Sequence, residues 1–390
     1  MPEWTLLLIL LLLPLAVWSG YRVGLREQQK KSEEGRYSSG YFAGLNYLLN
    51  EQPDKAIDIF IEQLQVDNEV VETHLALGNL FRRRGEVDRA IRIHQNLIAR
   101  PALPSATRKL ALQELAYDYL TAGLYDRAET LYIELLSEPK QKQKALTNLL
   151  VVYQQLKDWP KAIKTAQQLA SVSGKPESNR LVHFYCEIAD NDFTKDDTKQ
   201  AVEAIKQAIK ASTYALRPNL LLAKSYIDSG AYKKALKTYK VLTSHHISYI
   251  SEFLNEIKFC HTQLKTEAQF CKELESYLVQ GSNVDVLVMF SELAQKYHSE
   301  QYTEQVIQDF IMSQPSIGGL EQLLIHYMSE ANNEERGRLN KLHSFVVALI
   351  DENPRYRCKA CGYKSQSLLW QCPSCREWGK SSPLEIGEEH

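Results

Sequence analysis

The hydrophobic pattern of the chain begins with an uncharged stretch of 18 residues from Trp4 to Tyr21. As a helix with a rise of about 1.5 Å per residue it would be about 27 Å long, enough for a thin bilayer core. Aromatic residues stand at both of its ends, and no Lys or Arg precedes it. Bulky Trp18 occupies the region where a signal peptide would be cleaved. The pattern therefore predicts an uncleaved transmembrane helix over residues 1–21, in preference to a signal peptide or a buried helix.

The charges that follow this stretch predict its orientation. Arg22, Arg26, Lys30 and Lys31 lie in a basic linker, residues 22–36. Positive charge stays on the cytoplasmic side of a membrane, so we expect a short N-terminus outside and the bulk of the chain in the cytoplasm.

Small residues recur every four positions near the end of the apolar stretch, at Ala16, Gly20 and Gly24. Such a face allows two membrane helices to approach closely, in a partner protein or in a second copy of the chain. Chance in a short helix end rich in Ala and Gly explains the spacing equally well.

Beyond residue 36 the pattern becomes a repeat of helical hairpins. Its marker is an alanine that follows two polar residues, or Pro160 and Lys161 in one copy, and the successive alanines are 34, 38, 34, 39 and 34 residues apart (Ala56, Ala90, Ala128, Ala162, Ala201 and Ala235). A small residue, an aromatic residue and a turn precede the alanine, and another aromatic residue follows it. Two antiparallel helices that pack closely need a small residue at the contact and a large one beside it. The pattern resembles the tetratricopeptide repeat and predicts six units over residues 37–249.

The remaining helical periodicity carries no clear alanine marker. Residues 250–352 are therefore expected to form further degenerate helical hairpins of the same solenoid. Within the six units, Lys157 stands where other units have a turn glycine.

A solenoid of this kind binds segments of other proteins in the groove lined by its first helices. The residues that repeat position places in this groove, as candidates for partner binding, are Tyr41, Leu45, Leu48, Asn79, Arg82, Arg83, Gln113 and Tyr117. Each of them could instead belong to a solvated face or to packing between repeats.

Cysteine spacing predicts a metal site near the end of the chain. Four of the seven cysteines, Cys358, Cys361, Cys372 and Cys375, form two CxxC pairs separated by ten residues. Four thiolates in this arrangement suit one zinc or iron ion, and two pairs so close together favour a closed structural site over a redox-active one. The remaining three cysteines are expected to be small buried residues of the repeats (Cys186, Cys260 and Cys271).

The residues around these cysteines indicate a separate small module, residues 353–390. Five cations can offset the net negative charge of four thiolates and a divalent metal (Arg355, Arg357, Lys359, Lys364 and Arg376). The module is too short to bury a core alone, so the metal should provide much of its folding energy. Its apolar residues, including Trp370 and Trp378, should in part pack against the repeats.

Composition adds two exclusions. A net charge of −2 and a pI of about 6.6 disfavour nucleic acid as a partner. No nucleophile motif or phosphate-binding glycine loop is present in the sequence, so we expect no enzymatic activity. His245 and His246 are expected at the surface.

The YxCxxCGY and CPxC pairs resemble the metal knuckles of rubredoxins and a short ribbon in a bacterial recombination ATPase. That resemblance keeps one alternative open, an electron-transfer protein with bound iron and a docking surface made of repeats. In rubredoxins the two pairs lie much farther apart, which argues against this role.

The order of the elements, with MPEWTLLLILLLLPLAVWSGYRVG at the start and YRCKACGYKSQSLLWQCPSC near the end, resembles the lipopolysaccharide assembly protein B family of Gram-negative bacteria. The resemblance implies an adapter in the bacterial inner membrane, with a periplasmic N-terminus and no catalytic activity. It further implies control of lipopolysaccharide synthesis by promoting proteolysis of the UDP-acyl-N-acetylglucosamine deacetylase of lipid A synthesis. The implied partners are a membrane AAA+ zinc protease, that deacetylase, other lipopolysaccharide-synthesis or transport proteins and the bilayer.

Overall fold

A computed structural model describes residues 71–101, 103–280 and 283–384, with a few isolated positions before them (18, 21–22, 43–44, 46–47, 52, 55–56 and 58–59). Apart from Trp18 and Tyr21 in the predicted membrane segment and Arg22 in the basic linker, both regions lie outside the described residues. So do Ala16, Gly20, Gly24, Tyr41, Leu45 and Leu48. In the described part of the chain, no helix is both long and apolar enough to cross a bilayer.

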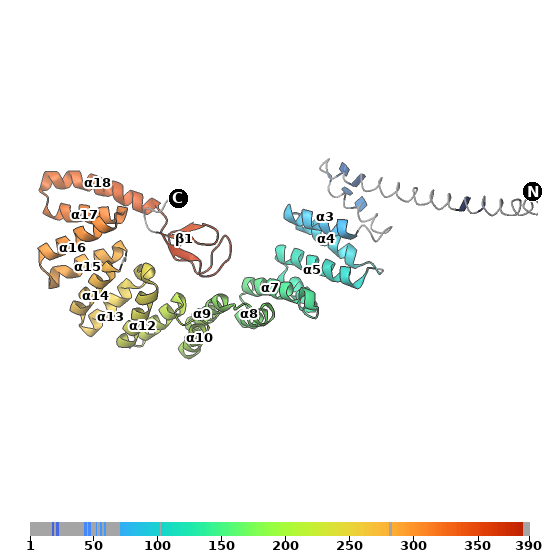
Figure 1. Ribbon diagram of the computed structural model, residues 1–390, viewed down its shortest axis with the longest axis horizontal. Coiled ribbons are helices and arrows are strands. Elements are labelled where there is room, and N and C mark those ends of the chain that lie inside the picture. Colours follow the sequence, from blue (N-terminus) through green and yellow to red (C-terminus); the bar gives the residue numbers. More distant parts are fainter. Residues whose placement is uncertain are drawn as a thin grey trace, which may run out of the picture. The chain divides into compact units, whose positions relative to one another are not determined.

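The chain divides into two compact units, Met1–Asp158 and Trp159–His390, both built mainly of α-helices (Figure 1). The described helices of the first unit are α3 (Val71–Arg83), α4 (Val87–Ile98), α5 (Ser105–Thr121), α6 (Tyr125–Leu135) and α7 (Pro139–Gln155). Those of the second unit are α8 (Trp159–Ser173), α9 (Ser178–Thr194), α10 (Thr198–Ala211), α11 (Leu216–Asp228), α12 (Tyr232–His245), the 3-10 helix η1 (Ile247–Glu252), α13 (Leu254–Leu264), α14 (Glu267–Val279), α15 (Val284–Tyr297), α16 (Glu300–Ser313), α17 (Ile317–Glu330) and α18 (Asn333–Glu352).

The same turn closes the first helix of successive repeats. Five residues before each of the five repeat alanines from Ala90 onward, the backbone has a positive φ, between 55° and 85° (Gly85, Gly123, Lys157, Asp196 and Gly230). In every case the N–H of the next residue donates to the carbonyl five positions earlier, as in Glu86 to Phe81 at 2.9 Å and Asp158 to Tyr153 at 2.9 Å. This pattern is a Schellman-type helix end. Lys157 therefore adopts the turn conformation that glycine adopts in its neighbours.

The repeat alanines form the contacts that their spacing predicted. All six have no exposed surface (Ala56, Ala90, Ala128, Ala162, Ala201 and Ala235). At Gly78 a Cβ would lie only 2.4 Å from Nε2 of His94, so the paired helices α3 and α4 leave no space for a side chain there. The predicted all-α repeat fold is confirmed, and Cys186, Cys260 and Cys271 are buried as expected.

After α18 the chain forms a small antiparallel sheet. Its strand order is β2 (Lys364–Ser365), β1 (Tyr356–Cys358), β3 (Ser381–Pro383). Cys358 pairs with Ser381 across β1 and β3, so the sheet joins both ends of the cysteine-rich segment. The module folds back against helices of the second unit that precede it by more than one hundred residues, as the hydrogen bonds below show (Figure 1).

Candidate metal centre and the Arg82 cluster

Two turns of the same geometry carry the four cysteines. In the first, Gly362 N–H donates to Cys358 O at 2.8 Å and Cys358 N–H donates to Tyr363 O at 2.8 Å. In the second, the equivalent bonds join Arg376 to Cys372 at 2.9 Å and Cys372 to Glu377 at 3.0 Å. Each turn has a positive φ at the residue after its second cysteine, 78° at Gly362 and 60° at Arg376. The backbone therefore positions both CxxC pairs alike.

The four cysteine sulfur atoms lie close together around a common centre. All lie within 4.8 Å of one another, with Cys358 Sγ 3.7 Å from Cys375 Sγ and Cys361 Sγ 3.5 Å from Cys372 Sγ. A tetrahedral ion with metal–sulfur bonds of about 2.3 Å requires sulfur–sulfur distances of about 3.8 Å. The sulfur positions and the donor set therefore fit one tetrahedral metal ion, zinc or iron.

Electrostatics at the sulfurs also favour a cation. The pKa of the Cys361 thiol is lowered to about 6 because the backbone N–H of Tyr363 donates to it, and the neighbouring thiols donate as well. Glu377 N–H also acts to lower the pKa of Cys375, yet that pKa is raised to about 12 by desolvation and by the other three cysteines that surround it. A divalent cation removes this conflict by stabilising all four thiolates together.

Trp378 joins the module to α8 and α9. Its side chain is buried and contacts the rings of Trp159, His183 and Phe184, with centroid distances of 6.2, 5.2 and 5.9 Å. Asn179 Nδ2 donates to the carbonyl of Trp378 at 2.8 Å. The expected packing of the module's apolar residues against the repeats is therefore present. We call this contact, made by Trp159, Asn179, His183, Phe184 and Trp378, the module seat.

Two tyrosines fix the module on η1. Tyr249 donates its hydroxyl to the carbonyl of Ser381 at 2.9 Å, and Tyr356 donates its hydroxyl to Glu252. Arg355 forms an ion pair with Asp285 of α15 at 3.1 Å. This cation therefore helps to attach the module to the helices.

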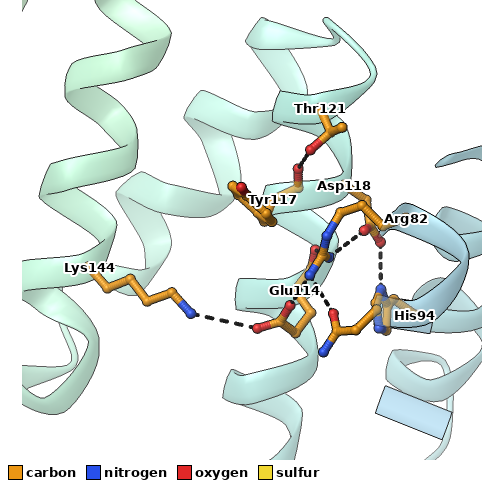
Figure 2. Close-up of polar contacts among 8 residues, drawn as sticks. Arg82, His94, Glu114, Tyr117, Asp118, Thr121 and Lys144 are labelled. Atoms are coloured by element: carbon orange, nitrogen blue, oxygen red, sulfur yellow. Dashed lines mark hydrogen bonds and ion pairs between the residues drawn. The ribbon is translucent and has the colours of Figure 1, made fainter. Parts of the chain in front are cut away.

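In the first unit, a cluster of charged side chains joins α3, α4 and α5 (Figure 2). The Arg82 guanidinium donates to Asp118 at 2.6 Å and to Glu114 at 2.7 Å, and it lies 4.6 Å from the centre of the Tyr117 ring. Asp118 is wholly buried and also contacts His94 Nδ1. Burial opposes ionisation of Glu114, but the hydrogen bond and charge of Arg82 outweigh it and lower the pKa of Glu114. We call Arg82, His94, Glu114 and Asp118 the Arg82 cluster.

The structure separates the predicted groove residues into accessible and engaged ones. Arg83 is exposed, Asn79 is partly exposed and 42% of Tyr117 is accessible. Gln113 is buried, and Arg82 is held by the carboxylates described above and by Asn79, whose side-chain oxygen accepts a hydrogen bond from it. Partner binding by these residues stays a prediction, for which Asn79, Arg83 and Tyr117 are the available surface.

Sequence reasoning missed His94, Glu114 and Asp118. One signal was present, because His94 occupies the repeat position where Tyr132 and Tyr239 stand in other units. A wholly buried histidine at an aromatic position needs a polar partner, and Asp118 is that partner. The two sequence positions are 24 residues apart, which no local pattern could connect.

Comparisons with known proteins find matches to both the helical repeats and the cysteine-rich module. The family described as "Tetratricopeptide repeat" matches residues 73–104 and 114–176, and the family described as "Rubredoxin metal binding domain" matches residues 356–380. The solved structure "Crystal structure of MamA protein" is similar at 17% identity, covers 47% of this chain and 96% of its own, and has a TM-score of 0.32.

Two relatives match along almost the full length. Lipopolysaccharide assembly protein B of Escherichia coli (strain K12) is 35% identical over 383 residues, 97% of this chain and 98% of the relative. The protein of the same name from Haemophilus influenzae is 33% identical and covers 98% of this chain and 99% of the relative. With identities above 30% over nearly the whole length, the chain belongs to the lipopolysaccharide assembly protein B family.

Proposed function

We propose that the chain is a non-catalytic adapter in lipopolysaccharide assembly, tethered to the bacterial inner membrane. The observation that carries this proposal is the match over 97% of the chain to a relative named for lipopolysaccharide assembly. The repeat scaffold supports the adapter role, because such scaffolds act by holding other proteins.

In the proposed mechanism, the adapter brings the lipid A pathway deacetylase to a membrane AAA+ zinc protease and so promotes its degradation. The first unit offers the groove surface of Asn79, Arg83 and Tyr117 for a protein segment. Arg82 supports Tyr117 from behind, so the exposed ring is held in place before a partner arrives. A preorganised aromatic residue lowers the entropy lost on binding.

The tether would act by raising the local concentration of the adapter at the membrane. A membrane helix at residues 1–21 restricts the adapter to the surface where the protease is found, which raises the effective concentration of the pair. The bulk of the chain would then face the cytoplasm, in keeping with a thiolate metal site in a reducing compartment.

The experiment is a measurement of deacetylase half-life in cells that express the full chain, the chain without residues 1–21, or the Tyr117→Ala variant. We expect a shorter deacetylase half-life in cells with the full chain than in cells without it. With either variant, the half-life should be longer than with the full chain. Thr121→Ala on the same helix is the matched control, since its exposed hydroxyl donates to the backbone carbonyl of Tyr117 at 2.8 Å and the Tyr117 ring is retained. An unchanged half-life with and without the full chain would refute the proteolysis mechanism.

The rubredoxin-type match supports one second candidate, electron transfer through bound iron. Purified protein would then be red and would undergo reversible one-electron reduction. Colourless protein with one zinc per chain removes this candidate, because zinc has no accessible redox change.

A further inference from the structure

A cavity of about 420 Å³ lies where the metal module meets the helices of the second unit. Its wall comes from α9, the first turn of α11, the end of α12 and the module itself. A volume of this size is in the range of pockets for small molecules. Neither the proposed adapter function nor the metal centre uses this cavity.

Among the described residues that line the cavity, one side chain is permanently charged, the guanidinium of Arg217. Of these described wall residues none is Asp or Glu, whereas Arg217, His245 and His246 are present. Arg217 is only 6% exposed. Glu187 and Asp190 offset the charge of this guanidinium from outside the wall, so an anionic occupant is favoured by its available N–H groups and by the lack of carboxylates on the wall itself.

The hydrogen bonds of Arg217 use one side of its guanidinium group and leave other N–H donors available. Nη2 donates to Glu187 at 2.8 Å and to Asp190 at 2.7 Å, and both of these carboxylates lie outside the cavity wall. Nη1 is buried and has no partner among the protein atoms. The two carboxylates therefore fix the direction of the guanidinium and leave Nη1 to bind a further acceptor.

The start of α11 adds a second source of positive potential at the same wall. Its N-cap residue, Ala215, offers no side-chain hydrogen bond, and Ala215 and Leu216 both line the cavity. The N–H groups of Leu216 and Arg217 have no partner within the helix, and the positive end of its dipole lies there, whereas Pro218, the third residue, has no N–H. Helix starts of this kind bind phosphate and carboxylate groups.

Aromatic rings form another part of the wall. Trp370 lies 5.6 Å from the Arg217 guanidinium, and Tyr214 stacks on His245 with ring centres 4.0 Å apart. His183 is buried and its Nδ1 has no partner among the protein atoms. Burial, together with the charge of Arg217, lowers the pKa of His183 to about 3, so at neutral pH this ring offers hydrogen bonding without charge.

We propose that this cavity binds a small organic anion that bears a phosphate or carboxylate group. The anionic group lies at Arg217 and the start of α11, and the remainder of the molecule lies against Trp370 and Tyr214. Such a ligand contacts the module and the repeats at once, so its binding stabilises the module in its seat.

The test is titration of the purified, metal-loaded full chain with inorganic phosphate, citrate and adenosine monophosphate. Isothermal calorimetry measures affinity and stoichiometry, and tryptophan fluorescence reports on the Trp370 wall. We expect saturable 1:1 binding of citrate or adenosine monophosphate, tighter than that of inorganic phosphate because only the organic anions contact the aromatic wall. The preferred probe identifies the anionic group as carboxylate or phosphate.

Two variants locate the site. Leu369→Glu places a carboxylate on the cavity wall and should weaken binding by at least about tenfold through like-charge repulsion. Arg217→Gln should weaken it by a similar factor. Leu342→Glu on α18, where the native side chain is 48% exposed, is the matched control and should bind like the native chain.

Three results would overturn the proposal. One is the lack of saturable binding of every probe up to about 10 mM, which would mean that the cavity holds only water. Another is binding of inorganic phosphate alone, since the aromatic wall would then have no role. The third is binding that Leu369→Glu leaves unchanged, which would place the anion elsewhere, and this variant keeps the test valid if Arg217→Gln fails to fold.

Discussion

The Arg82 cluster and the module seat both connect segments that are distant in the sequence, but they do so by opposite physics. The Arg82 cluster buries charges, with Asp118 wholly inaccessible between Arg82 and His94. The module seat buries aromatic rings around Trp378, and the ionisable groups beside it are the four cysteines that fit one metal ion.

The difference lies in what each connection needs in order to form. Charges removed from water are costly, so the Arg82 cluster is favourable only when every partner is present, and it specifies one pairing of helices. Aromatic packing tolerates small shifts, but the module behind it is too small to hold its shape without a ligand. The first connection therefore depends on side-chain complementarity and the second on metal supply.

Among the changes that test this comparison, loss of the metal should have the largest effect on folding. Cys372→Ser removes one of four ligands, and structural sites of this kind contribute on the order of 10 kcal/mol to folding. We expect metal content to fall well below one per chain and the tryptophan emission to shift to longer wavelength as Trp378 leaves its seat. Elemental analysis and fluorescence measure both changes.

Ser374→Ala, in the same turn and exposed, is the control for this variant and should retain the metal. The urea denaturation of the first unit should stay unchanged in Cys372→Ser. Full metal content in that variant would contradict the four-ligand site.

Breaking the Arg82 cluster should have the next largest effect. Asp118→Ala leaves Arg82 and His94 without their shared acceptor, and removal of one partner of a buried ion pair costs about 3–5 kcal/mol. Urea denaturation, followed by circular dichroism, should show this loss in the first unit while metal content stays at the native level. Asp126→Ala, at an exposed position in the first turn of α6, should cost much less. Equal losses for the two variants would show that the cluster is not a stabilising contact.

Acid should weaken the module seat through His183. The unfolded chain binds a proton at this residue below about pH 6.5, whereas in the folded chain its pKa is about 3, so stability falls as the pH drops through that window. Between pH 7 and pH 5 the expected loss is about 2 kcal/mol. Thermal denaturation of His183→Phe at the two pH values should show a smaller pH dependence than the native chain. The same pH dependence in both chains would exclude this histidine as the cause.

The smallest expected effect concerns a backbone conformation that occurs both in the repeats and in the metal module. Lys157 in the repeats and Arg376 in the module adopt positive φ values of 55° and 60°. The left-handed conformation costs a non-glycine residue about 1–2 kcal/mol, part of which glycine loses again through its greater unfolded entropy. Lys157→Gly and Arg376→Gly should each raise the free energy of unfolding by up to about 1 kcal/mol in urea titrations. A loss of stability would indicate that these side chains make contacts that outweigh the strain.

Local patterns were sufficient to predict much of this fold. The alanine spacing located the helix contacts because each contact lies within one repeat, and Lys157 was recognised at the turn because its neighbours carry glycine. The four cysteines were predicted as ligands because their spacing is itself the geometry of the site.

Contacts between repeats and across the chain could not be predicted in this way. Arg82 was a candidate groove residue with packing between repeats as one alternative, and repeat position could not decide between them because its carboxylate partners stand 32 and 36 residues away. The seat for Trp378 and the cavity beside it depend on where the module returns along the solenoid. No periodicity encodes that position, which is determined by the summed curvature of the intervening helices.

The hydrogen bond from Asn179 to Trp378 joins residues that are 199 positions apart, and this span sets an order of events during synthesis. A ribosome that adds about 5–20 residues per second makes Trp378 about 10–40 s after Asn179. Through that interval Trp378 is not available to the rings of Trp159 and Phe184, so these contacts can form only after the tail has been made and, for a module that needs its ligand to fold, has bound its metal. A cell short of that metal would accumulate full-length chains with a bare apolar patch, which chaperones and proteases recognise. The supply of metal would thus determine how much of the protein escapes degradation.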